Sequence, residues 1–425
     1  MKKGDPIYRQ YINILEEELR PAMGCTEPIA LAYAGAKARE LLNALPDRIQ
    51  VWVSGNIIKN VKSVKVPNTG GMVGIRVAAA IGAIAGDSSK DLEVIANVTE
   101  EDITKLHKYL EEKEVRVMPS ENEHILYIEI IGRTNDSYAK VVIADAHTNY
   151  MLIEKDNEVL YLNEKKIETA YANIDKSVLN IKDILEFADT VNIDDVKHIL
   201  DRQIHYNLAI AHEGIKGNYG ANIGKTILKY AQNDIITRCK ALAAAGSDAR
   251  MNGCDMPVVI VSGSGNQGIT CSVPVIYYAE QLNVSDELLY RALVVSNLCT
   301  IHIKNSIGKL SAFCGVVIAG AGAGAAIAYV DGGKEREVSH AIINALGIVS
   351  GVLCDGAKSS CAAKIAMSVE AGILGYFMFK DGNQFHSGDG FIKKGIENTI
   401  KAIGSVARVG MCETDKEIIQ IMMNE

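Results

Sequence analysis

Apolar positions recur at helical spacing in the first part of the chain. Residues 7–20 carry this pattern up to Pro21, and residues 29–45 resume it. We expect two helices there, because apolar residues three and four positions apart line one face of a helix. A strand-like run at 48–57 follows, and an Ala- and Gly-rich stretch at 77–86 predicts a third helix.

The middle of the chain has a different texture. Short runs of β-branched and aromatic residues predict strands, with one helical pattern at 103–112 among them. The strand-like runs are residues 92–98, 114–119, 125–132 and 139–146. Turn residues at 132–137 and 154–158 indicate antiparallel pairing of neighbouring runs. We therefore expect a small α+β module.

The rest of the chain is helical and rich in small residues, apart from one strand-like run at 257–261. The regular alternation of strand and helix that a doubly wound sheet requires is absent. We predict an α+β fold whose larger, mostly helical domain is formed by the N- and C-terminal segments. The expected segments are 1–88 (helical, carrying Cys25 and packing with the larger domain), 89–175 (the α+β module) and 190–425 (the main part of the helical domain).

Composition narrows the class of protein. The chain of 425 residues has a formal net charge of -8, which disfavours nucleic acid as a partner because phosphate binding needs a basic surface. The N-terminus is charged and carries no export signal, and the apolar stretches at 72–86 and 315–330 are too short to cross a membrane. We expect a cytoplasmic protein whose nine cysteines stay reduced and serve in packing, as ligands or as nucleophiles.

Three of those cysteines form the strongest local signal. Cys314 precedes Cys354 by 40 positions, and Cys354 precedes Cys361 by 7. This is not a ferredoxin spacing, and three structural thiols are an alternative. Cys314 and Cys361, however, each stand where a loop gives way to a small-residue helix, and the free amides of a helix N-terminus favour thiolates. A cluster with three ligands would leave one iron open to act as a Lewis acid.

Cys25 stands between two predicted helices. Thr26 is expected to be the N-cap of the second helix, with Glu27 in its first turn and Pro28 tolerated there. A thiol beside a helix N-terminus has a lowered pKa and can be reactive. A partly buried, inert cysteine is the alternative.

The glycine-rich stretch 262–268 follows a strand-like run. Gly263, Gly265 and Gly268 match a dinucleotide-binding fingerprint, but no second strand follows, so we favour a loop that binds an amino-acid carboxylate. Downstream, four polar residues lie just ahead of Cys314 and could belong to an active site or to a solvated helix face. They are His302, Lys304, Asn305 and Lys309.

Taken together, the motif GCTEPIALA, the SGSGNQG loop and the three C-terminal cysteines resemble the L-cysteine desulfidase family, which is related to the iron–sulfur L-serine dehydratases. The resemblance covers essentially the whole chain. GVLCDGAKSSC is similar to GLTCDPVAGQVQVPC of the serine dehydratases but is four residues shorter between its cysteines. The shorter spacing favours the desulfidase branch.

The resemblance implies an oxygen-sensitive [4Fe-4S] cluster on Cys314, Cys354 and Cys361, with Cys25 as the catalytic base and no pyridoxal phosphate. It implies β-elimination of L-cysteine to hydrogen sulfide, pyruvate and ammonia, and we expect a homo-oligomer without membrane or nucleic-acid partners. We expect the substrate to contact Thr26, Glu27, Ser264, Gly265, Asn266, Gln267, Asn305 and Lys309.

Three other readings stay open at the level of the sequence. The same site could dehydrate L-serine, because an oxophilic iron accepts a hydroxyl as readily as a thiol. A pyridoxal-phosphate lyase would need a Schiff-base lysine and a phosphate cup. A cluster-based redox sensor would need a partner surface, and no DNA-binding motif or basic stretch supports one.

Overall fold

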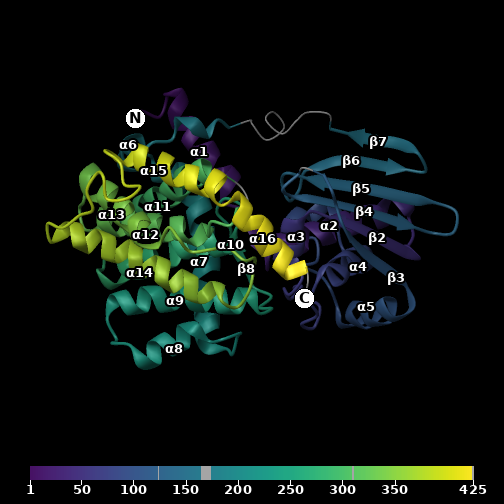
Figure 1. Cartoon of the computed structure of the whole chain (residues 1–425). Helices are drawn as coiled ribbons and strands as arrows, with labels where there is room; N and C mark the ends of the chain where they lie inside the picture. The colour runs from purple at the N-terminus through teal and green to yellow at the C-terminus, as the bar shows by residue number, and fades with distance from the viewer. Residues whose placement is uncertain (123, 164–173, 309–310, 424–425) are drawn as a thin grey trace.

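The computed structural model describes residues 1–122, 124–163, 174–308 and 311–423. Figure 1 shows two lobes: a larger one made of helices and a smaller one in which helices cover one face of a sheet. The mostly helical α+β fold expected from the sequence is confirmed.

The sheet lobe contains six strands in the order β3-β2-β4-β5-β6-β7. Neighbouring strands are antiparallel except β2 and β3, which are parallel and joined through helices. Its strands are β2 (Arg48–Val53), β3 (Glu114–Pro119), β4 (Tyr127–Arg133), β5 (Tyr138–Ala144), β6 (Tyr150–Lys155) and β7 (Glu158–Leu162). Its helices are α2 (Thr26–Leu42), α3 (Gly55–Val61), α4 (Ile75–Ala85) and α5 (Glu100–Glu112).

Two expectations change in this lobe. The boundary expected at residue 88 does not coincide with the division between lobes, because β2 pairs with β3 and β4 through backbone hydrogen bonds and α2 packs on β4 and β5.

The strand predicted at 92–98 is wrong. A 3₁₀ helix (Ser88–Glu93) and turns occupy this stretch, and Asp87 caps the 3₁₀ helix by accepting from the backbone amide of Ser89. A short apolar run is equally compatible with a buried turn.

The helical lobe packs around three long apolar helices, α11, α12 and α14. Its members are α1 (Pro6–Glu18), α6 (Ile181–Thr190), α7 (Ile193–Lys216), α8 (Ile223–Tyr230), α9 (Ile235–Met251), α10 (Gly265–Gln281), α11 (Asp286–Ile307), α12 (Gly315–Val330), α13 (Glu335–Val349), α14 (Cys361–Lys380) and α15 (Ile396–Ser405). A 3₁₀ helix (Lys176–Val178) precedes α6, and a π turn (Val406–Gly410) follows α15.

Helices α12 and α14 cross at backbone distance. A Cβ atom added at Gly320 would lie 2.2 Å from the carbonyl oxygen of Ser368, and one added at Gly324 would lie 2.3 Å from that of Gly372. Contacts advance along both helices in the same direction, so the two N-termini lie at the same end. α14 is long and apolar enough to cross a membrane by length and composition. Because α9, α12 and α13 cover it, we take it as a core helix.

Within the described ranges, the elements that reach from one lobe to the other include a short strand and the last helix. The short strand β1 (Pro21–Met23), which leads into α2, pairs antiparallel with β8 (Pro257–Val259) of the helical lobe. The last helix, α16 (Cys412–Met423), runs from the helical lobe across to α3 (Figure 1). There the ammonium of Lys59 lies 2.5 Å from the carboxylate of Asp415, with only 2% and 16% of these side chains exposed.

The crossing of α12 and α14 yields a stability prediction. Gly324→Ala should lower the free energy of unfolding by about 1–3 kcal/mol, because a methyl group must push the two backbones apart. Gly351→Ala is the matched control, since nothing lies within 4 Å of a Cβ added there. Urea unfolding followed by circular dichroism measures both. Equal stability of the two variants would contradict a tight crossing.

Candidate active site at the junction of the lobes

The structure brings Cys314 and Cys354 together through a backbone bridge. Phe313 and Leu353 pair as an isolated antiparallel bridge. The amide of Cys314 donates to the carbonyl of Val352 at 3.1 Å, and the amide of Cys354 donates to that of Ala312 at 2.6 Å. The 39 residues between the two cysteines are therefore the α12–α13 hairpin, whose ends return to one point.

Cys361 joins them because α14 begins at this residue, beside the start of α12. Cys314 is the N-cap of α12, so both thiols stand at helix N-termini, as predicted. Burial raises the pKa of Cys314 to about 12, and the charges of Cys354 and Cys361 raise it further. Burial also raises the pKa of Cys361, with Cys354 adding to the effect. The three thiols thus form one electrostatically connected group.

The loop that carries Cys354 is held from two sides. Lys364 of α14 donates to the carbonyl of Leu353 at 2.8 Å and to the carboxylate of Asp355 at 2.5 Å. Gly356 has φ +93°, and a Cβ there would lie 2.2 Å from the carbonyl oxygen of Lys59. Only glycine fits at this point, where the loop touches α3 of the other lobe.

Cys25 lies near this group. The residue is 2% exposed and clusters with Val64 and Met251, and Cys361 packs against this cluster. Burial raises the pKa of Cys25 to about 12, while the nearby charge of Arg250 lowers it. Cys25 itself, and not Thr26 as predicted, is the N-cap of α2. Gly24, at φ +59°, makes the tight turn between β1 and this helix.

The donor set fits an iron–sulfur cluster. Three thiols meet at two helix N-termini, where backbone amides favour the negative charge of thiolate-bound iron. Within the described ranges, no group of three or more His, Cys, Asp or Glu residues is arranged to hold a single metal ion. A cluster does not require such convergence, because each cysteine binds a different iron.

The glycine-rich loop opens α10 close to these thiols. Ser264 is the N-cap and accepts from the backbone amide of Gln267 at 3.4 Å. Gln267 is buried, and its side-chain amide lies against Gly315, the residue after Cys314; its Oε1 has no hydrogen-bond partner in the described part of the chain. Asn266 is buried and accepts from Arg250 Nη1 at 3.2 Å.

Glu27 anchors a second polar group beside Cys25. Its carboxylate accepts from Asn60 Nδ2 at 3.0 Å and from the Thr26 hydroxyl at 3.1 Å, and the hydroxyl also lies 3.1 Å from the carbonyl of Gly263. His147, from the turn between β5 and β6, places Nε2 3.9 Å from the same carboxylate. Burial raises the pKa of Glu27, but His147 and Arg250 outweigh it and hold the pKa below its usual range.

The polar residues ahead of Cys314 separate into different environments. Lys304 is buried; burial lowers its pKa to about 8, opposed by the charges of Cys354 and Cys314. His302 points elsewhere, with Nε2 2.7 Å from the Glu397 carboxylate. Asn305 is exposed on α11. Lys309 lies outside the described residues.

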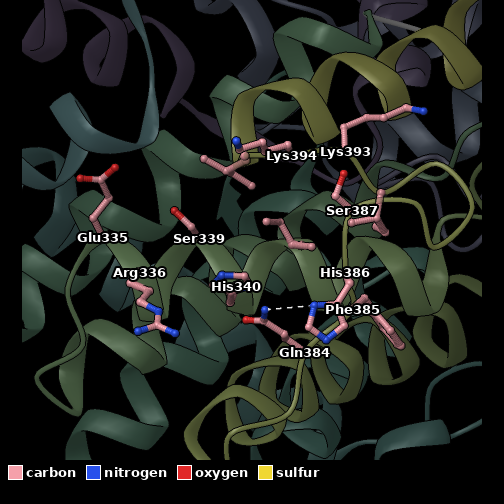
Figure 2. Close-up of a pocket in the computed structure, with 14 residues that line it drawn as sticks. Glu335, Arg336, Ser339, His340, Gln384, Phe385, His386, Ser387, Lys393 and Lys394 are labelled. Carbon is pink, nitrogen blue, oxygen red and sulfur yellow. Dashed lines mark hydrogen bonds between the residues drawn. The ribbon is translucent and has the colours of Figure 1, made fainter.

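A pocket of about 510 Å³ lies away from the cysteines, between α13 and α15. Figure 2 shows Arg336, His340 and His386 around it, with Gln384 and His386 joined by a 3.4 Å contact. No thiol or carboxylate pair lines it.

Sequence reasoning missed three residues of the site: Arg250, His147 and Asn60. Arg250 is a charge at the end of an Ala-rich run, and its burial becomes clear only from the packing of α9, whose neighbouring positions are buried on every side. His147 and Asn60 reach the site from the sheet lobe, and their proximity depends on how the lobes join. No local pattern reports that.

Comparison with known proteins agrees with this geometry. The family model for the serine dehydratase alpha chain matches residues 89–420. The chain belongs to this serine dehydratase alpha chain family. The family is of the iron–sulfur dehydratase type, which supports an enzyme and an iron–sulfur cofactor and confirms the resemblance found in the sequence.

Similar proteins align with the whole length of this chain. A UPF0597 protein of Desulfitobacterium hafniense is 55% identical over 426 residues, covering 100% of this chain and 99% of that protein. UPF0597 proteins of Treponema denticola and Lachnoclostridium phytofermentans are 46% and 48% identical. Both alignments cover 98% of this chain, and 98% and 100% of the respective relatives.

The ligand set gives a direct prediction. Cys354→Ala should lose most of its iron and its brown absorbance, because one corner of the three-thiol group is removed. Cys412→Ala, which changes an exposed thiol on α16, should keep both. Iron analysis and visible spectra after anaerobic reconstitution measure the difference. Full iron content in the Cys354 variant would remove this residue from the ligand set.

Proposed function

We propose that this protein eliminates sulfide from L-cysteine, giving hydrogen sulfide, pyruvate and ammonia. The observation that carries the proposal is that Cys361 packs against the buried cluster containing Cys25 and that its charge acts on Cys25. A fourth thiol, buried at the N-terminus of α2, therefore lies near a group of three thiols that can hold a cluster. A base on one side of a substrate and a metal on the other is the arrangement that β-elimination needs.

The proposed cofactor is a [4Fe-4S] cluster held by Cys314, Cys354 and Cys361, and no pyridoxal phosphate takes part. Such a cluster, when bound through three cysteines, supplies an open iron that acts as a Lewis acid toward the leaving sulfur. The charges of Lys304 and Lys364 lie near the ligands and offset the negative charge of the thiolates.

Cys25 takes the α-proton in the proposed reaction. The electron pair of the Cα–H bond forms the new C=C bond, and the C–S electron pair leaves with the sulfur as sulfide. The product aminoacrylate tautomerises to an imine and adds water, which releases pyruvate and ammonia. No electron is gained or lost overall, so the reaction needs no oxidant or reductant.

Cys25 must be a thiolate to act as a base, and burial opposes this. Two features of the chain favour the thiolate. Arg250 lies within electrostatic reach and lowers the pKa of Cys25. Cys25 also stands at the N-terminus of α2, where the helix dipole favours negative charge.

The proposed setting is the reducing cytoplasm, with oxygen sensitivity as the consequence of an open iron. All nine cysteines are free thiols, in keeping with that compartment. We keep three further predictions. The protein forms a homo-oligomer, it has no membrane or nucleic-acid partner, and its substrate contacts Ser264 and Gly265.

Dehydration of L-serine is a second candidate, favoured by the description of the matching family. The two reactions differ only in the leaving group. The shorter spacing between Cys354 and Cys361 is the reason we place cysteine first.

The deciding experiment is anaerobic purification with iron analysis, followed by assays on both substrates. We expect sulfide and pyruvate from L-cysteine in equal amounts, and a kcat/KM for L-serine at least about tenfold lower, the discrimination that one altered substrate contact supplies. Pyruvate formation from L-serine with L-cysteine unreactive would replace the first candidate by the second.

Cys25→Ala separates catalysis from cluster binding. The variant should keep its iron content and absorbance but lose turnover by about 10²–10⁴-fold, the usual contribution of a positioned base. Cys239→Ala, a buried thiol at the far end of α9, is the matched control and should stay active. Normal turnover in the Cys25 variant would exclude this residue as the base.

A further inference from the structure

Arg250 is a buried cation that forms no salt bridge within 4 Å in the described part of the chain, although its charge acts on Glu27 and Cys25 from a greater distance. Its side chain belongs to α9, and the residue is 5% exposed. A guanidinium carries five N–H donors, yet the hydrogen bond found for it is the one from Nη1 to Asn266 Oδ1. Its Nε is buried with no acceptor among the described residues. A buried charge left unpaired is costly, so this group is suited to receive an anion.

The residues around Arg250 hold its planar guanidinium group in a fixed position. A Cβ atom at Gly265 would lie 2.3 Å from Arg250 Nε, so only glycine leaves room for the guanidinium there. Asn266, the next residue, fixes one end through Nη1. A planar, fixed fork is matched to the two oxygens of a carboxylate, whereas a thiolate offers one acceptor atom.

Glu27 offers the complementary charge near Cys25. Its side chain is 13% exposed and is held by Asn60 and Thr26. A carboxylate has about four acceptor positions, so two hydrogen bonds leave capacity for an ammonium group. The charges of Arg250 and Glu27 both act on Cys25, whose Sγ lies 3.9 Å from Sδ of Met251, the residue after Arg250.

We propose that Arg250 and Glu27 form a clamp for the zwitterionic end of a free α-amino acid, with Arg250 on the α-carboxylate and Glu27 on the α-ammonium. The inference rests on the proposed function and extends it to the substrate class. The clamp turns the Cα–H bond toward Cys25 and leaves the β-substituent to face the three-thiol group. Removing the α-proton puts negative charge next to the carboxylate, and the guanidinium stabilises that charge as it develops.

The clamp makes a specific demand on substrates. A peptide lacks one of the two free charged groups, and an amine or an acid alone fills half of the clamp. The protein should therefore act on free α-amino acids.

Two small thiols test the clamp, because each carries only one of the charges. 3-Mercaptopropionate has a carboxylate and no amine, and cysteamine has an amine and no carboxylate. Both keep the thiol, so any contact of sulfur with the cofactor is common to the two. Their affinities are measured by calorimetry on the anaerobic, iron-loaded protein, without turnover.

Arg250→Gln should weaken the binding of 3-mercaptopropionate by about tenfold or more, because a hydrogen bond between charged groups is lost. The affinity for cysteamine should change by less than about threefold. Glu27→Gln should do the reverse. Arg238→Gln, an exposed arginine on the same helix α9, and Glu40→Gln, an exposed glutamate on α2, are matched controls and should change neither affinity.

Arg250→Lys and Glu27→Asp cover the case in which the first variants do not fold. Each variant keeps the charge of the original residue. Arg250→Lys should weaken only the binding of 3-mercaptopropionate and Glu27→Asp only that of cysteamine, each by less than the neutral variant does. Equal weakening of both ligands by either variant, or no effect of Arg250→Gln and Arg250→Lys on 3-mercaptopropionate, overturns the clamp.

The clamp and the proposed function fail separately. Sulfide release by the wild-type protein without the crossed pattern of affinities removes the clamp alone. The crossed pattern together with no reaction of L-cysteine supports the clamp and removes the desulfidase activity.

Discussion

The close crossing of α12 and α14 is the constraint on which the site depends. Glycines at the crossing let the two backbones touch, and the helices run in the same direction. Two N-termini therefore open onto one point, with Cys314 on one and Cys361 on the other. Since Cys354 is bridged to the first of these by backbone hydrogen bonds, the packing of small residues in the core determines where the three thiols meet.

Charged side chains surround the point where the helix N-termini meet. Lys304 and Lys364 lie near the three thiols, whereas Arg250 and Glu27 lie near Cys25. Both Lys304 and Arg250 are almost fully buried. Positive groups are buried in a protein interior when a negative partner compensates them, and the thiolates and substrate carboxylate of the proposed function would supply such partners.

The sequence predicted the helices, most strands and the position of Cys314 and Cys361 at helix starts, because these depend on local spacing and capping. It could not predict that β2 belongs to the sheet, since strand pairing is a long-range property. The apolar run at 92–98 was misread for a related reason: burial alone does not distinguish a strand from a turn. Arg250 was overlooked because a single charge in a helix is usually exposed, and only the packing of α9 on its neighbours shows otherwise.

The last helix gives the molecule a further property. Cys25 and Glu27 move with the sheet lobe, whereas the three other thiols and Arg250 move with the helical lobe. Hinge rotation between the lobes would change the distance between these two sets of residues. α16 spans the two lobes, and rotation would have to separate Lys59 from Asp415 in a largely dry environment. The carboxy-terminal segment thus works as a brace that resists a change in the separation between Cys25 and the other three thiols.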